Sequence, residues 1–204
     1  MTYKYNKFEN GVVHNIFPMA VMEFKPPIDT VKLITELETY NSNLRPHSSL
    51  DGNATSIYDP ACNLLLEPQF NTLKLEIDKC IKEFSTVIGY VDDLMIVNSW
   101  FSIMNKGSRL RRHNHKASII SGAYHPKCPD GSVGLTFNNP LEPYKMCELY
   151  DKDTEYNANE CTFPVREGHL ILFPSWLEHE TKINTTTNER YVMSFNTQPS
   201  RNFE

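Results

Sequence analysis

The sequence predicts a mainly β domain of the sandwich or jelly-roll type, preceded by supporting helices. The chain has 204 residues, which suits a single hydrophobic core, because one core seldom exceeds about 250 to 300 residues. Residues 1–94 carry two helical patterns, whereas residues 95–204 consist of short β-like runs separated by turn residues. There is no internal repeat, low-complexity tract or evident linker. We therefore expect residues 1–204 to form one domain.

Two stretches in the first ninety residues have the apolar spacing of amphipathic helices. The first has its apolar positions between residues 28 and 37, with Asp29 suited to cap its start. The second carries apolar residues from 70 to 88. The segment between them, residues 41–66, is rich in Ser, Asn, Asp and Pro and is predicted to be a long loop.

From residue 95 the runs are rich in β-branched and aromatic residues, which favour strands. Nine short runs in about a hundred residues indicate a sandwich or jelly roll, because alternating βαβ units would need a helix between strands. We expect strands at 95–104, 117–125, 133–138, 161–166, 169–174 and 190–197, with weaker ones near 108–113, 146–150 and 180–183.

Composition excludes several classes of function. Twenty basic and 25 acidic residues give a net charge of −5, which argues against bulk binding to nucleic-acid phosphates. No apolar run approaches the roughly 18 to 20 residues that cross a membrane. The five cysteines contain no CxxC pair, so we expect reduced thiols and a cytoplasmic location.

The clearest chemical signal is a set of three histidines. His113 and His115 are two positions apart, so on a strand their imidazoles share one face and reach the same ion. His179 follows an apolar strand and a turn, and a closed sheet would bring it opposite the pair. These three are the predicted metal ligands. The other histidines, at positions 14, 47, 125 and 169, show no such pattern and are not assigned.

Two motifs around these histidines resemble those of cupins. Gly107 followed by His113-x-His115 is similar to the first cupin motif, and Gly168, Pro174 and His179 are spaced as in the second. The resemblance implies a double-stranded β-helix. The chain departs from it in two ways: no glutamate follows the histidine pair, and Trp176 stands where the second motif has glycine.

A closer resemblance is to the 2-oxoglutarate/Fe(II) oxygenases of marine bacteria and their viruses. It covers most of the chain, and the residues between 99 and 196 are the specific part. They are Ser99-Trp100, Gly107, His113-x-His115, Ser121–Tyr124, the run from Gly168 to His179, and Arg190 ahead of Ser194-Phe195-Asn196.

This resemblance implies an enzyme with Fe(II) as cofactor and 2-oxoglutarate as co-substrate, in the cytoplasm of a bacterium or of a viral host. The reaction would be oxidative decarboxylation to succinate and CO₂, coupled to hydroxylation of a C–H bond. Arg190 would hold the far carboxylate, a task that suits its planar, permanently charged fork. Tyr124 and Ser102 are weaker candidates for contacts with 2-oxoglutarate.

Two features depart from the related enzymes. Val192 occupies the position two residues after the arginine where they have serine, and Ser194 lies too far along the strand to replace it. His115 occupies the position of the usual carboxylate ligand. Three imidazoles still suit Fe(II), and they also leave zinc, nickel or manganese as candidates. A carboxylate from Glu178 or Glu180 is an alternative ligand.

The substrate and the partners remain open. The loop 41–66 and the polar insert 126–160 could shape a pocket for a peptide, a nucleotide or a small metabolite. The basic cluster of Arg109, Arg111 and Arg112 either meets an anion or forms a solvated face. The sequence also leaves open whether the chain forms a homodimer. Two rival functions remain, a metal-dependent cupin enzyme that does not use 2-oxoglutarate and a non-enzymatic jelly-roll module.

Overall fold

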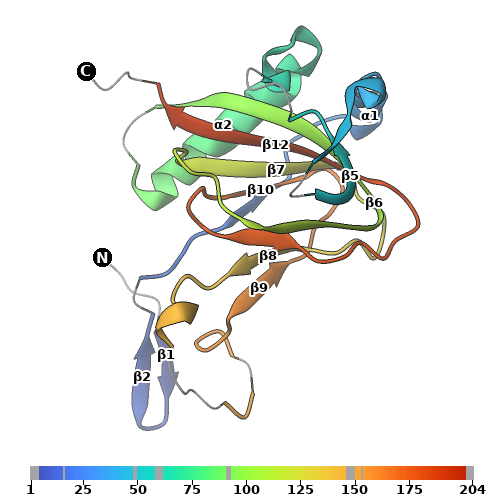
Figure 1. The fold of residues 1–204 in the computed structure, drawn as a ribbon. Coiled ribbons are helices and arrows are strands. Elements are labelled where there is room, and N and C mark those ends of the chain that lie inside the picture. The colour runs from blue at the N-terminus through green and yellow to red at the C-terminus, as the bar shows by residue number, and fades with distance from the viewer. Residues whose placement is uncertain are drawn as a thin grey trace.

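A curled antiparallel sheet of ten strands dominates the computed structural model of the chain (Figure 1). The structure describes residues 5–15, 17–47, 50–57, 62–90, 93–145, 150–152 and 154–200. The strands of this sheet are β3 (Met22–Phe24), β4 (Arg45–His47), β5 (Leu50–Thr55), β6 (Leu94–His113), β7 (Ile120–Lys127), β8 (Leu135–Asn138), β9 (Glu160–Phe163), β10 (His169–Pro174), β11 (His179–Thr181) and β12 (Arg190–Pro199). The mainly β prediction is confirmed.

The remaining elements are short or lie outside the sheet. A separate hairpin, β1 (Tyr5–Phe8) and β2 (Gly11–His14), projects from the body of the molecule (Figure 1). The α-helices are α1 (Thr30–Glu38) and α2 (Asn71–Ile88), and single 3₁₀ turns occur at Asn41–Asn43, Leu64–Leu66, Pro68–Phe70 and Glu142–Tyr144. Among the described residues, no helix is both long enough and apolar enough to span a membrane.

The sheet folds into two walls that share strand β6. One wall has the order β3-β10-β7-β12-β6, and the other continues as β6-β11-β8-β9. The first half of β6 pairs with β12 and its second half pairs with β11. Gly107 lies between these halves with a φ of +83°, a conformation that glycine adopts without steric cost. The predicted strands 95–104 and 108–113 are therefore one long strand that changes partner near this glycine.

The helices cover the outer face of the first wall, as Figure 1 shows for α2 against β12 and β7. Apolar side chains of the two helices pack against alternate residues of the strands, among them Tyr191, Met193 and Phe195 of β12. Side chains of a strand alternate between its faces. The intervening Arg190, Val192 and Ser194 therefore point to the space between the two walls. Asp29 caps α1, since its carboxylate accepts from the backbone N–H of Lys32 at 3.1 Å.

The long loop predicted for residues 41–66 is wrong in part, because it contains β4 and β5. Strand β5 pairs with β6 between Leu50 and Thr55. Its residues, LDGNAT, are poor strand formers, but this strand lies beside the long edge offered by β6, and backbone hydrogen bonds to that neighbour decide its conformation. The predicted weak strand near 146–150 lies largely outside the described residues.

Candidate active site

The three predicted ligand histidines meet between the two walls. His113 ends β6 and His179 begins β11, and these two residues are paired across the strands. His115 follows two residues after His113, where its backbone N–H donates to the Ser175 carbonyl at 2.9 Å. One ring nitrogen from each histidine lies within 4.8 Å of the other two. His179 lies 64 positions after His115 in the sequence, and the fold brings it to the same point as the His113-x-His115 pair, as the sequence predicts.

Backbone carbonyls select the tautomer of two of these rings. Nδ1 of His113 lies 2.7 Å from the Arg111 carbonyl, and Nδ1 of His179 lies 3.0 Å from the Leu177 carbonyl. A carbonyl can only accept, so each Nδ1 carries the proton and each Nε2 keeps its lone pair. Burial, together with the neighbouring imidazoles, lowers the pKa of His115 and of His179 to about 3. The rings are therefore neutral at pH 7, as metal ligands must be.

This geometry fits a divalent transition metal ion. Two nitrogens that are each about 2.1 Å from one ion lie at most about 4.2 Å apart, so the three ring nitrogens, which lie within 4.8 Å of one another, need only a small side-chain adjustment to share an ion. Carbonyl hydrogen bonds to the second ring nitrogen are the usual support of metal-binding histidines. Neutral imidazole suits iron, zinc, nickel and copper, so the donor set fits Fe(II).

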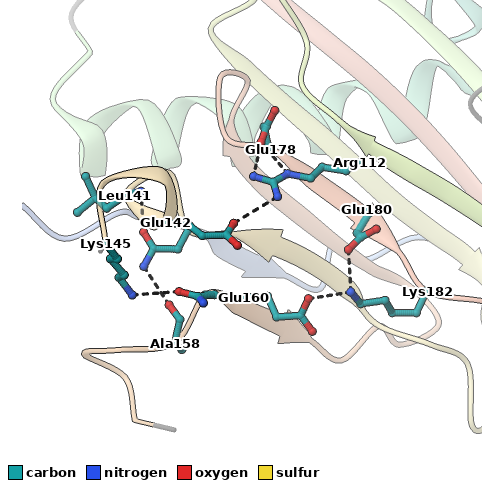
Figure 2. Close-up of polar contacts among 11 residues, drawn as sticks. Arg112, Leu141, Glu142, Lys145, Ala158, Glu160, Glu178, Glu180 and Lys182 are labelled. Atoms are coloured by element: carbon teal, nitrogen blue, oxygen red, sulfur yellow. Dashed lines mark hydrogen bonds and ion pairs between the residues drawn. The ribbon is translucent and has the colours of Figure 1, made fainter. Parts of the chain in front are cut away.

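The two alternative carboxylate ligands point elsewhere in the structure. Glu178 forms an ion pair with Arg112 at 2.7 Å, and Glu180 forms one with Lys182 at 2.7 Å (Figure 2). Neither belongs to the group of side chains close enough to share an ion. Within the described residues, the candidate metal centre consists of three imidazoles.

A cavity of about 200 Å³ extends from the three histidines between the walls. Its lining is largely apolar, with Trp100, Met104, Phe173 and Val192 among the side chains. Arg190 reaches the same cavity from β12, where it pairs with Met104 of β6. The structure thus brings Arg190 and the histidine cluster together, as the resemblance implies.

Arg190 is a buried cation without an anionic partner. Its side chain is 1% exposed, and its Nη1 donates to the Val133 carbonyl at 2.8 Å. Its Nε has no hydrogen-bond partner, and no Asp or Glu pairs with it in the described part of the chain. Burial lowers the pKa of the guanidinium to about 10, so it stays charged at pH 7. A buried charge is costly unless it is paired, which marks this end of the cavity as a site for an anion.

The structure places Ser102 and Tyr124, the two weaker candidates for contacts with 2-oxoglutarate, in different environments. Ser102 lines the cavity, and its hydroxyl donates to Thr55 Oγ1 at 2.9 Å. Tyr124 lies on the opposite face of β7, in the core under the helices, and is fully buried. Its hydroxyl has no hydrogen-bond partner among the described residues. A contact between Tyr124 and 2-oxoglutarate does not fit this position, because the strand alternation turns the ring away from the cavity.

Strand alternation instead directs His125 to the cavity side of β7. The sequence pattern does not assign this histidine to the site. His125 is fully buried, and neither of its ring nitrogens has a partner within the described structure. It lies two residues after Ala123, which lines the cavity. That spacing was available from the sequence, but only the register of β7 against β12 identifies which alternate set faces inward.

The basic cluster before the histidines is neutralised by carboxylates. Arg109 and Arg111 both pair with Asp51 at 2.8 Å. Arg112 bridges Glu178 and Glu142, which joins β6 to the segment after β8 (Figure 2). All three arginines are exposed. The cluster therefore forms a solvated, ion-paired face, and the positive charge of the cavity comes from Arg190.

A buried polar bridge supports the turn before His179. Ser121 of β7 donates to the Asn196 side chain at 2.7 Å, and its oxygen lies 2.8 Å from the Ser175 hydroxyl. Because the Ser121 proton is used for Asn196, Ser175 is the donor in the second bond. The Ser175 carbonyl in turn holds the backbone of His115. The bridge thus connects the central strands to both ends of the histidine cluster.

Comparison with protein families gives one match. Residues 98–196 match the model described as "Putative 2OG-Fe(II) oxygenase". This range contains the three histidines, His125 and Arg190. No curated protein matches the chain.

Solved structures with the same fold include several enzymes of this chemistry. A prolyl-4-hydroxylase from Pseudomonas putida has a TM-score of 0.61 at 13% identity, covering 90% of this chain and 94% of its own. HygX from Streptomyces hygroscopicus, with nickel, 2-oxoglutarate and hygromycin B bound, has a TM-score of 0.60 at 12% identity, covering 89% and 84%. The α-ketoglutarate-dependent epimerase SnoN from nogalamycin biosynthesis has a TM-score of 0.65 at 10% identity, covering 89% and 79%.

Proposed function

We propose that this chain is a hydroxylase of the 2OG-Fe(II) oxygenase family built on a double-stranded β-helix, because residues 98–196 match the model of that family. In this proposal His113, His115 and His179 bind Fe(II), and Arg190 binds the far carboxylate of 2-oxoglutarate. The observation that carries the proposal is the buried guanidinium of Arg190, which has no anionic partner among the described residues and lines the cavity that also holds three neutral imidazoles. One dianionic co-substrate with a chelating keto acid at its other end satisfies both.

The residues of the chain have distinct tasks in this reaction. When bound, Fe(II) and 2-oxoglutarate supply the oxidising power, since decarboxylation to succinate is coupled to activation of dioxygen. The carbonyls of Arg111 and Leu177 keep two imidazoles in the ligating tautomer. Arg190 would orient the co-substrate through a charge-assisted hydrogen bond to its far carboxylate. The apolar walls, including Trp100 and Phe173, exclude water from the reacting atoms.

The substrate class that we propose is a peptide or a small molecule. The fold is shared with HygX, whose structure contains hygromycin B, and with a Trichoplax adhaerens prolyl hydroxylase bound to a peptide fragment. Nucleotides remain a further alternative. The three arginines that precede His113 are already paired with carboxylates, which disfavours a substrate held mainly by phosphates. A homodimer and a cytoplasmic location remain predictions.

The test is anaerobic binding of 2-oxoglutarate to the Fe(II)-loaded protein, followed by succinate release in air. Replacing His179 with alanine should abolish metal retention. Replacing Arg190 with methionine should keep the metal but weaken 2-oxoglutarate binding by about 100-fold or more, because the partner of a buried charge is lost. R190M should not be less stable to urea than the wild type, since the uncompensated buried cation is removed. R109Q, on the exposed face, is the matched control.

Two results would contradict the proposal. Metal-dependent turnover of another compound without 2-oxoglutarate consumption would favour a three-histidine cupin enzyme. Failure of the wild type to retain any divalent metal, with H179A unchanged in behaviour, would favour a non-enzymatic module.

A further inference from the structure

The third ligand histidine is held differently from the other two. His113 ends β6 and His179 begins β11, and the pairing of these strands fixes both backbones. His115 lies beyond the end of β6, in the segment that leads to β7. Its backbone N–H donates to the Ser175 carbonyl at 2.9 Å, and its ring centroid lies 5.8 Å from that of Trp100. The position of this ligand therefore depends on where the Ser175 carbonyl lies.

Neighbouring elements impose the shape of the segment 114–119. Ala117 has a φ of +61°, a conformation that residues other than glycine rarely adopt. Its carbonyl accepts from Gln198 Nε2 at 3.0 Å, and the Ile119 N–H donates to the Thr197 carbonyl at 3.0 Å. Strand β12 thus anchors the later part of the segment, whereas the turn between β10 and β11 anchors the part next to the histidine cluster.

A chain of buried hydrogen bonds fixes that turn. The backbone N–H of Ser175 donates to the Ile119 carbonyl at 3.0 Å, so Ser175 is bound to the segment on both sides of the turn. Its hydroxyl donates to Ser121 at 2.8 Å, and the Ser121 hydroxyl donates to Asn196 Oδ1 at 2.7 Å. Ser121 of β7 and Asn196 of β12 are themselves paired across the strands. The Ser175 carbonyl is therefore referenced to the centre of the first wall.

The three side chains of this hydrogen-bond chain depend on one another. Ser175, Ser121 and Asn196 are 0%, 1% and 6% exposed. Water cannot readily replace a lost partner at such buried positions, so removing one hydroxyl leaves a neighbouring group unpaired. Both hydroxyls donate in the same direction, from Ser175 toward Asn196. The loss of either hydroxyl should therefore release the Ser175 turn.

The spacing of the imidazoles shows that His115 limits the fit to a metal ion. The ring centroids of His113 and His179 are 4.4 Å apart, whereas that of His115 lies 5.0 Å from His113 and 5.1 Å from His179. Ligand nitrogens around one ion can be at most about 4.2 Å apart. Binding by all three imidazoles therefore depends on accurate placement of His115.

We propose that the hydrogen-bond chain Ser175–Ser121–Asn196 positions His115 and thereby sets the affinity of the three-histidine cluster for a divalent metal. This inference rests on the proposed function, because it concerns the same metal centre. The three side chains are positioning residues, which act through the Ser175 carbonyl and its hydrogen bond to the His115 backbone. Without the chain, the cluster should keep its two strand-held ligands and lose a well-placed third one.

The experiment measures Co(II) binding to the full chain, because the visible spectrum of Co(II) depends on its ligands and their geometry. S175A should bind Co(II) about 10- to 100-fold more weakly than the wild type in calorimetry, the usual effect of losing an outer partner of a metal ligand. Its Co(II) spectrum should shift toward that of H115A, which lacks the third imidazole. S121A should lose as much affinity, and S121A/S175A no more than S121A alone, because the two hydroxyls act in series.

The matched control is T136V, which removes a buried hydroxyl of β8 that lies 2.8 Å from Thr162 Oγ1 and outside the hydrogen-bond chain. Its Co(II) affinity and spectrum should remain those of the wild type, whatever the change in its stability to urea. A general loss of stability would affect T136V and S175A alike, so the comparison separates positioning of His115 from support of the fold.

A second measurement does not depend on any variant folding. In the wild type, hydrogen exchange of the His115 backbone amide should be slow both with and without Co(II), because the Ser175 carbonyl holds this N–H. A His115 amide that exchanges as fast as an exposed one, or S175A with wild-type Co(II) affinity and spectrum, would overturn the inference. If the wild type itself retains no Co(II), it is the proposed function that fails.

Discussion

Tyr124 and His125 are adjacent in sequence, yet the structure gives them opposite environments. The tyrosine ring lies among apolar side chains below α1 and α2, whereas strand alternation turns the fully buried histidine to the same side of β7 as Ala123. The effect of burying the polar atoms of these two side chains differs accordingly. Among the described residues, the Tyr124 hydroxyl has no hydrogen-bond partner and lies in the apolar core under the helices, so its burial destabilises the fold.

Replacing Tyr124 with phenylalanine should therefore stabilise the protein. Removing a buried hydroxyl that has no partner recovers its desolvation penalty, about 1 kcal/mol, and the ring keeps its packing. Urea unfolding of the metal-free protein at pH 7.5 measures the change. The affinity for 2-oxoglutarate should remain that of the wild type, because the ring is on the helix side of β7. A destabilised variant, or one with weakened 2-oxoglutarate binding, would show that the hydroxyl has a partner at the cavity.

Strand β7 shows how close packing of a central strand restricts the residues that its positions can hold. It lies between β10 and β12, and every residue from Ile120 to Pro126 is buried. Gly122 faces the helices at the point where the Phe195 ring of β12 crosses over it. A β-carbon at this position would lie 2.2 Å from Phe195 Cζ and 2.8 Å from Leu172 Cδ2. The glycine is required by close packing and not by its backbone angles.

Replacing Gly122 with alanine should lower the free energy of unfolding by about 1 to 3 kcal/mol, the usual range for overpacking a core. Phe195 must change rotamer or β12 must move, and β12 also carries Arg190. We therefore expect weaker 2-oxoglutarate binding together with lower stability, measured by calorimetry and urea unfolding. The control is G11A, at an exposed position without a positive φ, where no atom of the described structure lies within 4 Å of the added β-carbon. G122A with wild-type stability would contradict the packing that we describe.

The elements differ in how far the sequence determines them. The apolar spacing of α2 and the alternation in β12 are local signals, and both correspond to the observed structure. The i, i+2 histidine pair could likewise be predicted, because two such side chains share one face wherever the backbone is extended. In contrast, β5 has the composition of a loop and is a strand because β6 lies beside it. Which residues of β7 face the cavity depends on pairing with β12, including a register shift between Tyr191 and Met193, and no local pattern encodes that shift.

Among the described residues, buried ionisable groups with shifted pKa values lie mainly in two places, the cavity and the core around the helices. In the cavity, histidines are held neutral and Arg190 is held charged. Around the helices, the half-buried Tyr40, two fully buried tyrosines and Cys80 are held protonated. Burial raises the pKa of Tyr40 and of Tyr191 to about 12 and that of Cys80 to about 11, and it also raises the pKa of Tyr124. The core that supports the first wall is thus sensitive to alkaline pH.

Stability should accordingly fall between about pH 9 and pH 12. The folded-state pKa of each of these groups lies above its ordinary value, 10.0 for tyrosine and 9.0 for cysteine. The unfolded chain therefore releases protons that the folded chain retains, and the stabilisation, complete below about pH 9, is lost as pH rises. The slope is at most about 1.4 kcal/mol per pH unit for each group.

Urea unfolding from pH 8 to pH 11, with tyrosinate absorbance as the reporter of ionisation, measures this loss of stability. Y124F should show a shallower decline than the wild type, since one of the groups is gone; equal slopes, or constant stability up to pH 11, would mean that these side chains ionise freely in the folded protein.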